Sequence, residues 1–191
     1  MNYLGHLYLS GNDENVIIGN FIADFVKGNS YKKFPEAIQK GILMHRKIDE
    51  YTDSHQSTKD ISKILRGTYG KYSTIISDML IDHVLATNWN DYHNKSLYVF
   101  SIKSYLTMVK HFSVLPKQMQ HILPFLIQSN RLYSYSRESG ILKAIQIMER
   151  YSSLPKKSNE LKIVFNDRKL DIFENSKQFL TDVSKEFLQH T

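Results

Sequence analysis

The stretch PEAIQKGILMHRKIDEYTD, residues 35–53, decides the fold class. Its proline stands where the first turn of a helix tolerates one, and the residues that follow keep helical spacing to the end of the stretch. One face, at steps of three and four residues, carries first apolar and then ionisable side chains: Ile38, Ile42, His45, Asp49 and Asp53. The stretch therefore predicts a helix with one buried face, along which apolar residues are followed by ionisable residues.

Helical spacing also runs through the rest of the chain, and no run of strand alternation interrupts it. Gly28 and Gly67 are placed to end two of the predicted helices. The expected helical segments are 2–10, 14–27, 57–66, 73–87, 95–112, a segment opened by Pro116, 140–151 and 157–190. This pattern predicts an all-α fold, a helical bundle in which residues 1–191 form one domain.

Length and composition restrict the class of protein further. A chain of 191 residues with 41% hydrophobic and 23% charged residues is ordinary for one globular domain. No apolar run approaches the roughly 18 residues of a membrane span, and residues 1–10 lack the features of a secretory signal. With no Cys and no signal segment, the cytoplasm is the expected location, and we expect no membrane partner.

The chain is basic, with 25 Lys and Arg against 19 Asp and Glu and a formal net charge of +6. An excess of this size favours an acidic partner. No known nucleic-acid-binding pattern is present, and the twelve Tyr and ten Phe are better explained by core packing, so a nucleic-acid partner is not expected. The oligomeric state is left open.

Two more predicted helices carry carboxylates on their buried stripes. In segment 73–87, Ile75 and Leu85 bracket the residues Asp78 and Asp82, and His83 follows directly. In segment 14–27, the stripe through Ile17 and Phe21 leads to Asp24. Buried carboxylates and imidazoles need compensation, because desolvation of an unpaired charge costs several kcal/mol or more.

Two compensations are open at this point. One is a structural ion network with Arg46, Lys47 or another histidine. The other is a divalent metal, because His45 and Asp49 lie one helical turn apart and project side by side. A site dominated by Asp favours Mn²⁺ or Mg²⁺ over a thiolate-type zinc site. His6 is interpreted as a core histidine or as a residue that supports the ligands.

Four blocks of sequence stand out in the first 90 residues. They are Asn2-Tyr-Leu-Gly-His6-Leu, Ile18 to Gly28 with Asp24, Gly41 to Asp53 with His45 and Asp49, and Asp78 to Ala86 with Asp82 and His83, followed by Trp89. As a set, these blocks closely resemble the acyl carrier protein phosphodiesterases. Beyond the first 90 residues, only the order of features is similar.

This resemblance implies an all-helical fold related to the HD-type metal phosphohydrolases and Mn²⁺-stimulated hydrolysis of holo-acyl carrier protein. The products would be apo-acyl carrier protein and 4′-phosphopantetheine. Acyl carrier proteins are strongly acidic, so the basic excess would help to steer and dock this partner. The order Asp82-His83 reverses the His-Asp doublet of HD enzymes, so no ligand roles are transferred from that superfamily.

From these observations we expect one or two divalent metals, Mn²⁺ or Mg²⁺, held mainly by His45, Asp49, Asp78, Asp82 and His83. Asp24 is expected across the site as a ligand or base, which makes Asp24, His45, Asp49, Asp82 and His83 the candidate catalytic residues. Arg46 and Lys47 are the candidates for binding the phosphate or the carrier protein. Two other functions are compatible with the residues: a metal phosphohydrolase acting on a nucleotide or other small phosphodiester, and a non-catalytic helical module that binds an acidic protein.

Overall fold

In the computed structural model, which describes residues 1–188, helices account for every regular element and no strand is found in that range. The prediction of an all-α fold is confirmed. The first half comprises α1 (Tyr3–Leu9), α2 (Glu14–Ile22), α3 (Glu36–Ser54), α4 (Gln56–Tyr69) and α5 (Ser73–Thr87). The second half comprises α6 (Leu97–Lys110), α7 (Lys117–Gln128), α8 (Arg131–Ser134), α9 (Glu138–Tyr151), α10 (Ser158–Asp167) and α11 (Lys169–Leu188). Short 3₁₀ helices join them: η1 (Ala23–Phe25), η2 (Gly28–Lys33), η3 (Gly70–Tyr72), η4 (Trp89–Asp91) and η5 (Phe112–Val114).

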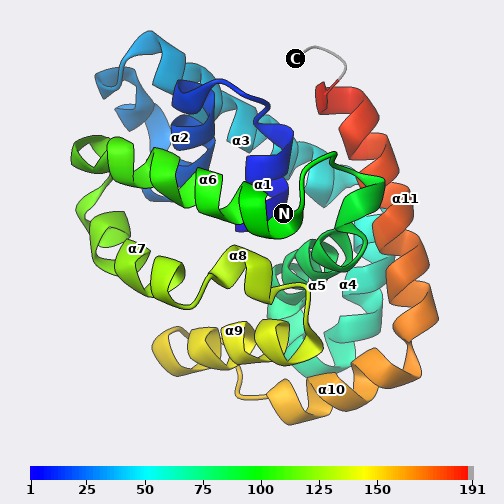
Figure 1. Ribbon diagram of the computed structural model, residues 1–191. Helices are drawn as coiled ribbons and strands as arrows, with labels where there is room; N and C mark the ends of the chain where they lie inside the picture. Colours follow the sequence, from blue (N-terminus) through cyan, green and yellow to red (C-terminus); the bar gives the residue numbers. More distant parts are fainter. Residues whose placement is uncertain (189–191) are drawn as a thin grey trace.

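The short helix α1 lies in the middle of the molecule, where it packs against α2, α5 and α11 (Figure 1). Helices α4, α5 and α11 form one side, and α6 and α7 form the other side. Residues Leu4 to Leu9 of α1 are all buried. This first helix therefore carries its side chains directly into the core, although it has only seven residues.

Helices α2 and α3 approach each other closely at two glycines. A Cβ atom on Gly19 would lie 2.1 Å from the carbonyl oxygen of Ile38 and 2.9 Å from the Cα atom of Gly41. A Cβ atom on Gly41 would in turn lie 2.3 Å from the carbonyl oxygen of Val16. Backbone contact at this crossing brings the end of α2, with η1 after it, against the middle of α3.

Three details in the first half of the chain differ from the sequence-based expectations. Helix α2 ends at Ile22, and the next three residues form η1. Gly67 lies inside α4, because the helix continues to Gly70, whose φ of +55° no other residue adopts easily. Ile75 is 39% exposed and does not belong to the core stripe of α5.

The expected last helix, 157–190, is in fact two helices, α10 and α11, that meet at Arg168. The sequence has no Pro or Gly there. The break arises from packing, because α10 contacts α9 and α4 whereas α11 runs along α4 and α5. The end of the predicted segment, residues 189–190, lies outside the described residues. Among the helices that the structure describes, none is both long enough and apolar enough to cross a membrane.

Candidate metal centre

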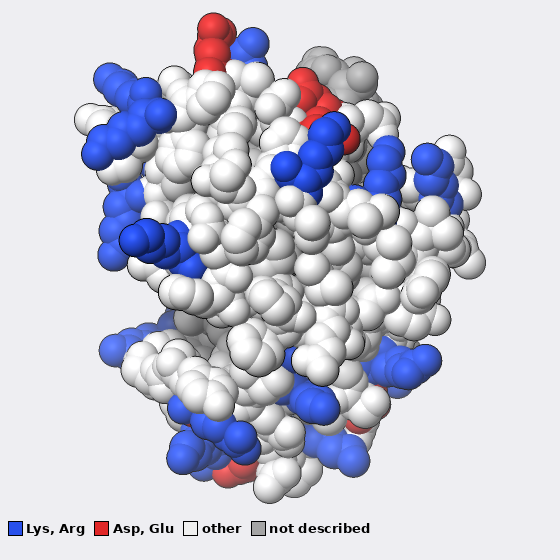
Figure 2. All heavy atoms as spheres, turned by 60° about the vertical axis from the view of Figure 1, so that its left-hand side comes forward, with Lys and Arg blue, Asp and Glu red and all other residues white. Residues whose placement is uncertain are grey.

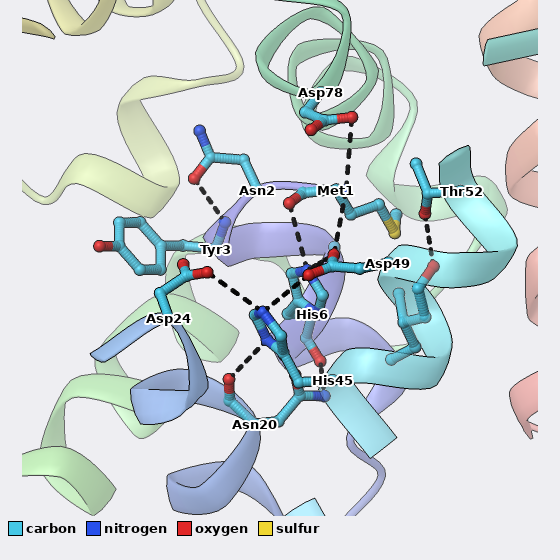
Figure 3. A network of polar contacts seen from close by, with 12 residues as sticks. Met1, Asn2, Tyr3, His6, Asn20, Asp24, His45, Asp49, Thr52 and Asp78 are labelled. Atoms are coloured by element: carbon cyan, nitrogen blue, oxygen red, sulfur yellow. Dashed lines mark hydrogen bonds and ion pairs between the residues drawn. The ribbon is translucent and has the colours of Figure 1, made fainter. Parts of the chain in front are cut away.

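Ionisable side chains from α1, α3 and η1 meet at one point beneath the N-terminus of the chain (Figure 3). Asp49 is at the centre: its Oδ1 lies 3.1 Å from His6 Nε2, and its Oδ2 lies 3.1 Å from His45 Nε2. Asp24 approaches from η1, with Oδ1 at 3.3 Å from His45 Nε2. We call these four residues, His6, Asp24, His45 and Asp49, the His–Asp cluster.

The two imidazole rings lie face to face. Their centroids are 3.8 Å apart, and the ring planes of His6 and His45 differ by 15°. Both rings direct Nε2 toward the same carboxylate, and one ligand atom from each of His6, His45 and Asp49 lies within 4.8 Å of the other two. Three donors at this spacing can reach one cation between them.

A buried side-chain amide holds the Nδ1 side of the His45 ring. His45 Nδ1 donates to the carbonyl oxygen of Asn20 at 2.9 Å and to its Oδ1 at 3.0 Å. The Asn20 amide is itself held, because its Nδ2 donates to the carbonyl oxygen of His6 at 3.0 Å and to Ser10 Oγ at 2.9 Å. With Nδ1 occupied in this way, Nε2 is the nitrogen of His45 that can bind a metal.

The cluster separates the pKa values of its two histidines. Burial lowers the pKa of His6 to about 4, against the opposing effect of its hydrogen bond to Asp49. Burial also disfavours the charged form of His45, but hydrogen bonds to Asp24 and Asp49 outweigh it and raise the pKa to about 9. Hydrogen bonds from the two histidines outweigh burial at Asp49 and hold its pKa well below the usual range. One imidazolium and one neutral imidazole thus share a carboxylate at neutral pH.

The cluster opens to solvent on its carboxylate side. The side chains of Asp24 and Asp49 are 61% and 42% exposed, whereas those of His6 and His45 are 4% and 6% exposed. Hydrogen bonding to His45 lowers the pKa of Asp24, so this carboxylate is ionised at neutral pH. The cluster is therefore accessible to solvent through its two carboxylates, whereas the two histidine rings are held within the core.

The two carboxylates of α5 lie next to the cluster, on the far side of Met1. The Met1 amino group is 3.7 Å from Asp49 Oδ1 and 3.3 Å from Asp78 Oδ1 (Figure 3). Asp82 is fully buried, and its oxygens accept hydrogen bonds from the backbone N–H groups of Leu4 at 2.8 Å and Gly5 at 3.1 Å. Burial raises the pKa of Asp82 to about 7, despite these hydrogen bonds and the nearby amino group. Asp82 thereby fixes the start of α1, and so the position of His6.

His83 faces another part of the molecule. Its Nδ1 lies 2.6 Å from the carbonyl oxygen of Tyr135, and its ring packs edge-on against Phe165 and Phe173. Neighbouring residues of a helix project about 100° apart, so Asp82 and His83 cannot both point at one centre. The structure brings Asp24, His45 and Asp49 together with Asp78 close by, and it places His83 elsewhere.

Arg46 and Lys47, the two residues expected to bind the phosphate or the carrier protein, lie outside the His–Asp cluster contacts described above. Arg46 donates through Nη2 to the carbonyl oxygens of Val26 at 3.0 Å and Gly28 at 2.7 Å, and its guanidinium lies over the Tyr31 ring. Through these hydrogen bonds, Arg46 holds the segment after η1 against α3. Lys47 lines a groove between α3 and the end of α11.

Two residues at this site, His6 and Asn20, have only a weak signal in the sequence. The sequence indicates that His6 is a core histidine or a residue that supports the ligands, and only the fold brings its Nε2 to Asp49. Asn20 is a polar residue on an apolar stripe, and the sequence does not indicate which residue its side chain would hydrogen-bond to. The signal available for both was a polar residue inside an otherwise apolar helix face.

The donor set fits a divalent cation. It offers two imidazole nitrogens and one to two carboxylates, a mixed nitrogen and oxygen set that suits a divalent first-row ion. The geometry also fits, because both rings direct Nε2 toward Asp49 and one ligand atom from each of the three residues lies within 4.8 Å of the other two. The fold and site together define an all-helical protein with a histidine–aspartate centre able to hold a metal.

The chain that carries this centre matches a known protein family. The family model for acyl carrier protein phosphodiesterase matches residues 1–187, and the chain belongs to this family of enzymes. Membership does not favour the two rival functions, a small-phosphodiester hydrolase and a non-catalytic binding module.

Curated relatives agree with the family model. The acyl carrier protein phosphodiesterase of Yersinia pestis is 32% identical over 149 residues, which cover 78% of this chain and 77% of the relative. That of Photorhabdus laumondii is 28% identical over 155 residues, with 78% and 76% covered. That of one Escherichia coli strain is 37% identical over 90 residues, 47% of each chain. No solved structure shows a significant match.

Proposed function

We propose that this chain is a metal-dependent phosphodiesterase that hydrolyses holo-acyl carrier protein to apo-acyl carrier protein and 4′-phosphopantetheine. The observation that carries the proposal is the convergence of His6, His45 and Asp49 in a chain of this family. The enzymes from Yersinia pestis and Photorhabdus laumondii are named for the same activity.

The proposed ligands are His6 Nε2, His45 Nε2 and Asp49, with Asp24 as a further ligand or as the base. A divalent cation, Mn²⁺ or Mg²⁺, would supply water of lowered pKa and neutralise charge on the phosphoryl group. When His45 loses a proton to bind the cation, its hydrogen bond to Asn20 keeps the remaining proton on Nδ1, so Nε2 is the ligand atom. Asp82 holds α1 so that His6 stays in place.

The exposed carboxylate of Asp24 has the freedom to act on substrate. Because its pKa is lowered, it is ionised at neutral pH and can accept a proton from an attacking water. Within the cluster it contacts His45, and it faces solvent. This position lets it orient the water while the buried residues hold the metal.

The direct test is the mass of the carrier protein. Incubation of holo-acyl carrier protein with the enzyme and Mn²⁺ should remove the phosphopantetheine mass, and a chelator should prevent the loss. Unchanged carrier protein with Mn²⁺ and with Mg²⁺ would contradict the proposal. A parallel panel of nucleotide diesters checks the small-substrate alternative.

Variants of two aspartates locate the chemistry. Asp24→Asn should lower kcat by about 10²- to 10⁴-fold, the range expected for loss of a general base, with helical content unchanged. Asp53→Asn is the matched control, because Asp53 is on the same stripe of α3 as Asp49 but is exposed. Equal activity in the two variants would remove Asp24 from the site.

A further inference from the structure

The net positive charge of the chain comes from one continuous segment of the sequence. Residues 92–137 contain no Asp or Glu, yet they include six of the 25 Lys and Arg, so the remaining 19 balance the 19 acidic residues. These six are Lys95, Lys103, Lys110, Lys117, Arg131 and Arg137. The segment spans α6, η5, α7 and α8. A charge bias confined to one structural unit gives one side of the molecule a local positive potential.

The same elements expose an unusual amount of apolar surface. On α6, four exposed side chains recur at helical spacing: Val99, Ile102, Leu106 and Val109. Tyr98 adds to the exposed set on α6. The set extends over η5 and α7 through Phe112, Ile122, Phe125 and Ile127. The most exposed are Leu106 at 63% and Phe125 at 67%. Figure 2, which brings the α6 and α7 side forward, shows a broad uncharged area with Lys and Arg around it. We call this surface the α6–α7 face.

Single exposed hydrophobic residues are normal, but a contiguous group with a charged border is typical of a binding surface. The other side of α6 already packs inward through Leu97, Tyr105 and Met108. The exposed stripe is therefore not needed for the core of this chain, and it is available to a second molecule.

The α6–α7 face adjoins the elements that carry the His–Asp cluster. Helix α6 packs against α2, which leads directly into η1 and Asp24. At the other end, the exposed Tyr98 ring packs edge-on against Tyr133, with centroids 5.6 Å apart, and the Arg137 guanidinium lies 5.8 Å from the Tyr133 ring centroid. A molecule bound to this face therefore lies next to α2, the helix that leads into Asp24.

We propose that the α6–α7 face is the docking surface for the protein substrate and that it takes an acidic amphipathic helix of that protein. This inference rests on the proposed function in one respect, that the substrate is a protein. Charge complementarity identifies the occupant: carboxylates along the edges of such a helix meet the basic border, and its apolar stripe covers Leu106 and Phe125. A second copy of this chain fits poorly, because a two-fold interface would bring the same basic borders together.

The experiment compares two pairs of substitutions in steady-state hydrolysis of holo-acyl carrier protein. Leu106→Ser with Phe125→Ser removes apolar contact, and Lys103→Glu with Lys117→Glu reverses the border charge. Lys110 is left intact because it pairs with Glu14 at 2.7 Å. Each pair should raise KM and lower kcat/KM by about tenfold or more, with kcat little changed, because docking is lost while the cluster is intact.

Matched controls lie on α10 and α11, on the other side of the molecule (Figure 1). Ile163→Ser with Leu170→Ser removes two equally exposed apolar residues, at 62% and 77%, and Lys162→Glu with Lys177→Glu reverses two exposed charges. Both controls should keep kcat/KM within about twofold of the parent. The parent's KM should rise with salt, and the charge-reversed pair should lose most of this dependence.

The outcomes separate this inference from the proposed function. A parent enzyme that leaves holo-acyl carrier protein intact contradicts the function itself. A parent that is active but indistinguishable from both face variants overturns the docking surface alone. Two further results also overturn it. In the first, the parent protein binds phosphatidylglycerol vesicles, and the substitutions abolish this binding without changing kcat/KM. In the second, the parent protein is a dimer in sedimentation equilibrium, and the substitutions dissociate the dimer.

Discussion

His6 and His45 lie with their rings stacked, centroids 3.8 Å apart, and both direct Nε2 at the carboxylate of Asp49. The pair joins two helices far apart in the sequence, α1 and α3. It also places a ring of lowered pKa beside a ring of raised pKa. This arrangement leads to predictions about metal binding, its supporting residues and its pH dependence.

The first prediction concerns which histidines bind the metal. His6→Asn should weaken Mn²⁺ binding by about 100-fold or more, because it removes one of the three convergent donors. His83→Asn should leave the affinity and the stoichiometry unchanged, because that ring faces Tyr135. Isothermal titration calorimetry measures both. Weaker binding in the His83 variant alone would reverse the assignment.

The second prediction concerns Asn20. Asn20→Ala removes the amide that holds His45 Nδ1, and it should weaken Mn²⁺ binding by about 10- to 100-fold and reduce the free energy of unfolding by about 1–3 kcal/mol. Ser62→Ala is the control, because it breaks a buried hydrogen bond to Ser73, between α4 and the start of α5. Urea unfolding should show loss of stability in both variants, and calorimetry should show loss of metal affinity only in the first. Similar affinities in the two would mean that Asn20 only stabilises the fold.

The third prediction is a pH dependence of metal binding. His45 has a raised pKa of about 9 without metal, so near pH 7 it must lose a proton before Nε2 can bind a cation. Binding at pH 7 should therefore release about one proton, and the apparent affinity should rise by about tenfold per pH unit until about pH 9. Titrations in buffers of different ionisation enthalpy count the proton. An affinity that is flat between pH 7 and 9 would show that His45 is not a ligand.

The fourth prediction concerns the crossing of α2 and α3. Gly41→Ala would place a Cβ atom 2.3 Å from the Val16 carbonyl oxygen, and it should cost about 1–3 kcal/mol or more because two backbones must separate. Gly67→Ala is the matched control, because a Cβ atom there meets nothing within 4 Å. Inside α4, this alanine should instead stabilise the protein by about 0.5–1 kcal/mol. Thermal unfolding measures both, and a shift in the same direction for the two would contradict the close packing at Gly41.

Several features of this protein follow from the sequence alone. Helical spacing in residues 35–53 predicts α3 almost to its ends, and Pro116 marks the start of α7. The change from Ile42 to His45 and Asp49 on one face also points to a site on α3, because periodicity is a local property of the chain. The motifs of the first 90 residues predict the family that the full-length match shows.

The tertiary structure decided which ionisable residues meet. His6 and Asn20 reach His45 only because the close glycine contact seats α2 on α3 and because Asp82 anchors the start of α1. Packing elsewhere in the molecule also decides two details. His83 is turned toward Tyr135, and contacts with α4, α5 and α9 break the last predicted helix at Arg168. A stripe on one helix tells which side chains point inward, but the distance between atoms on different helices depends on how the helices cross, and that is set by contacts remote in the sequence.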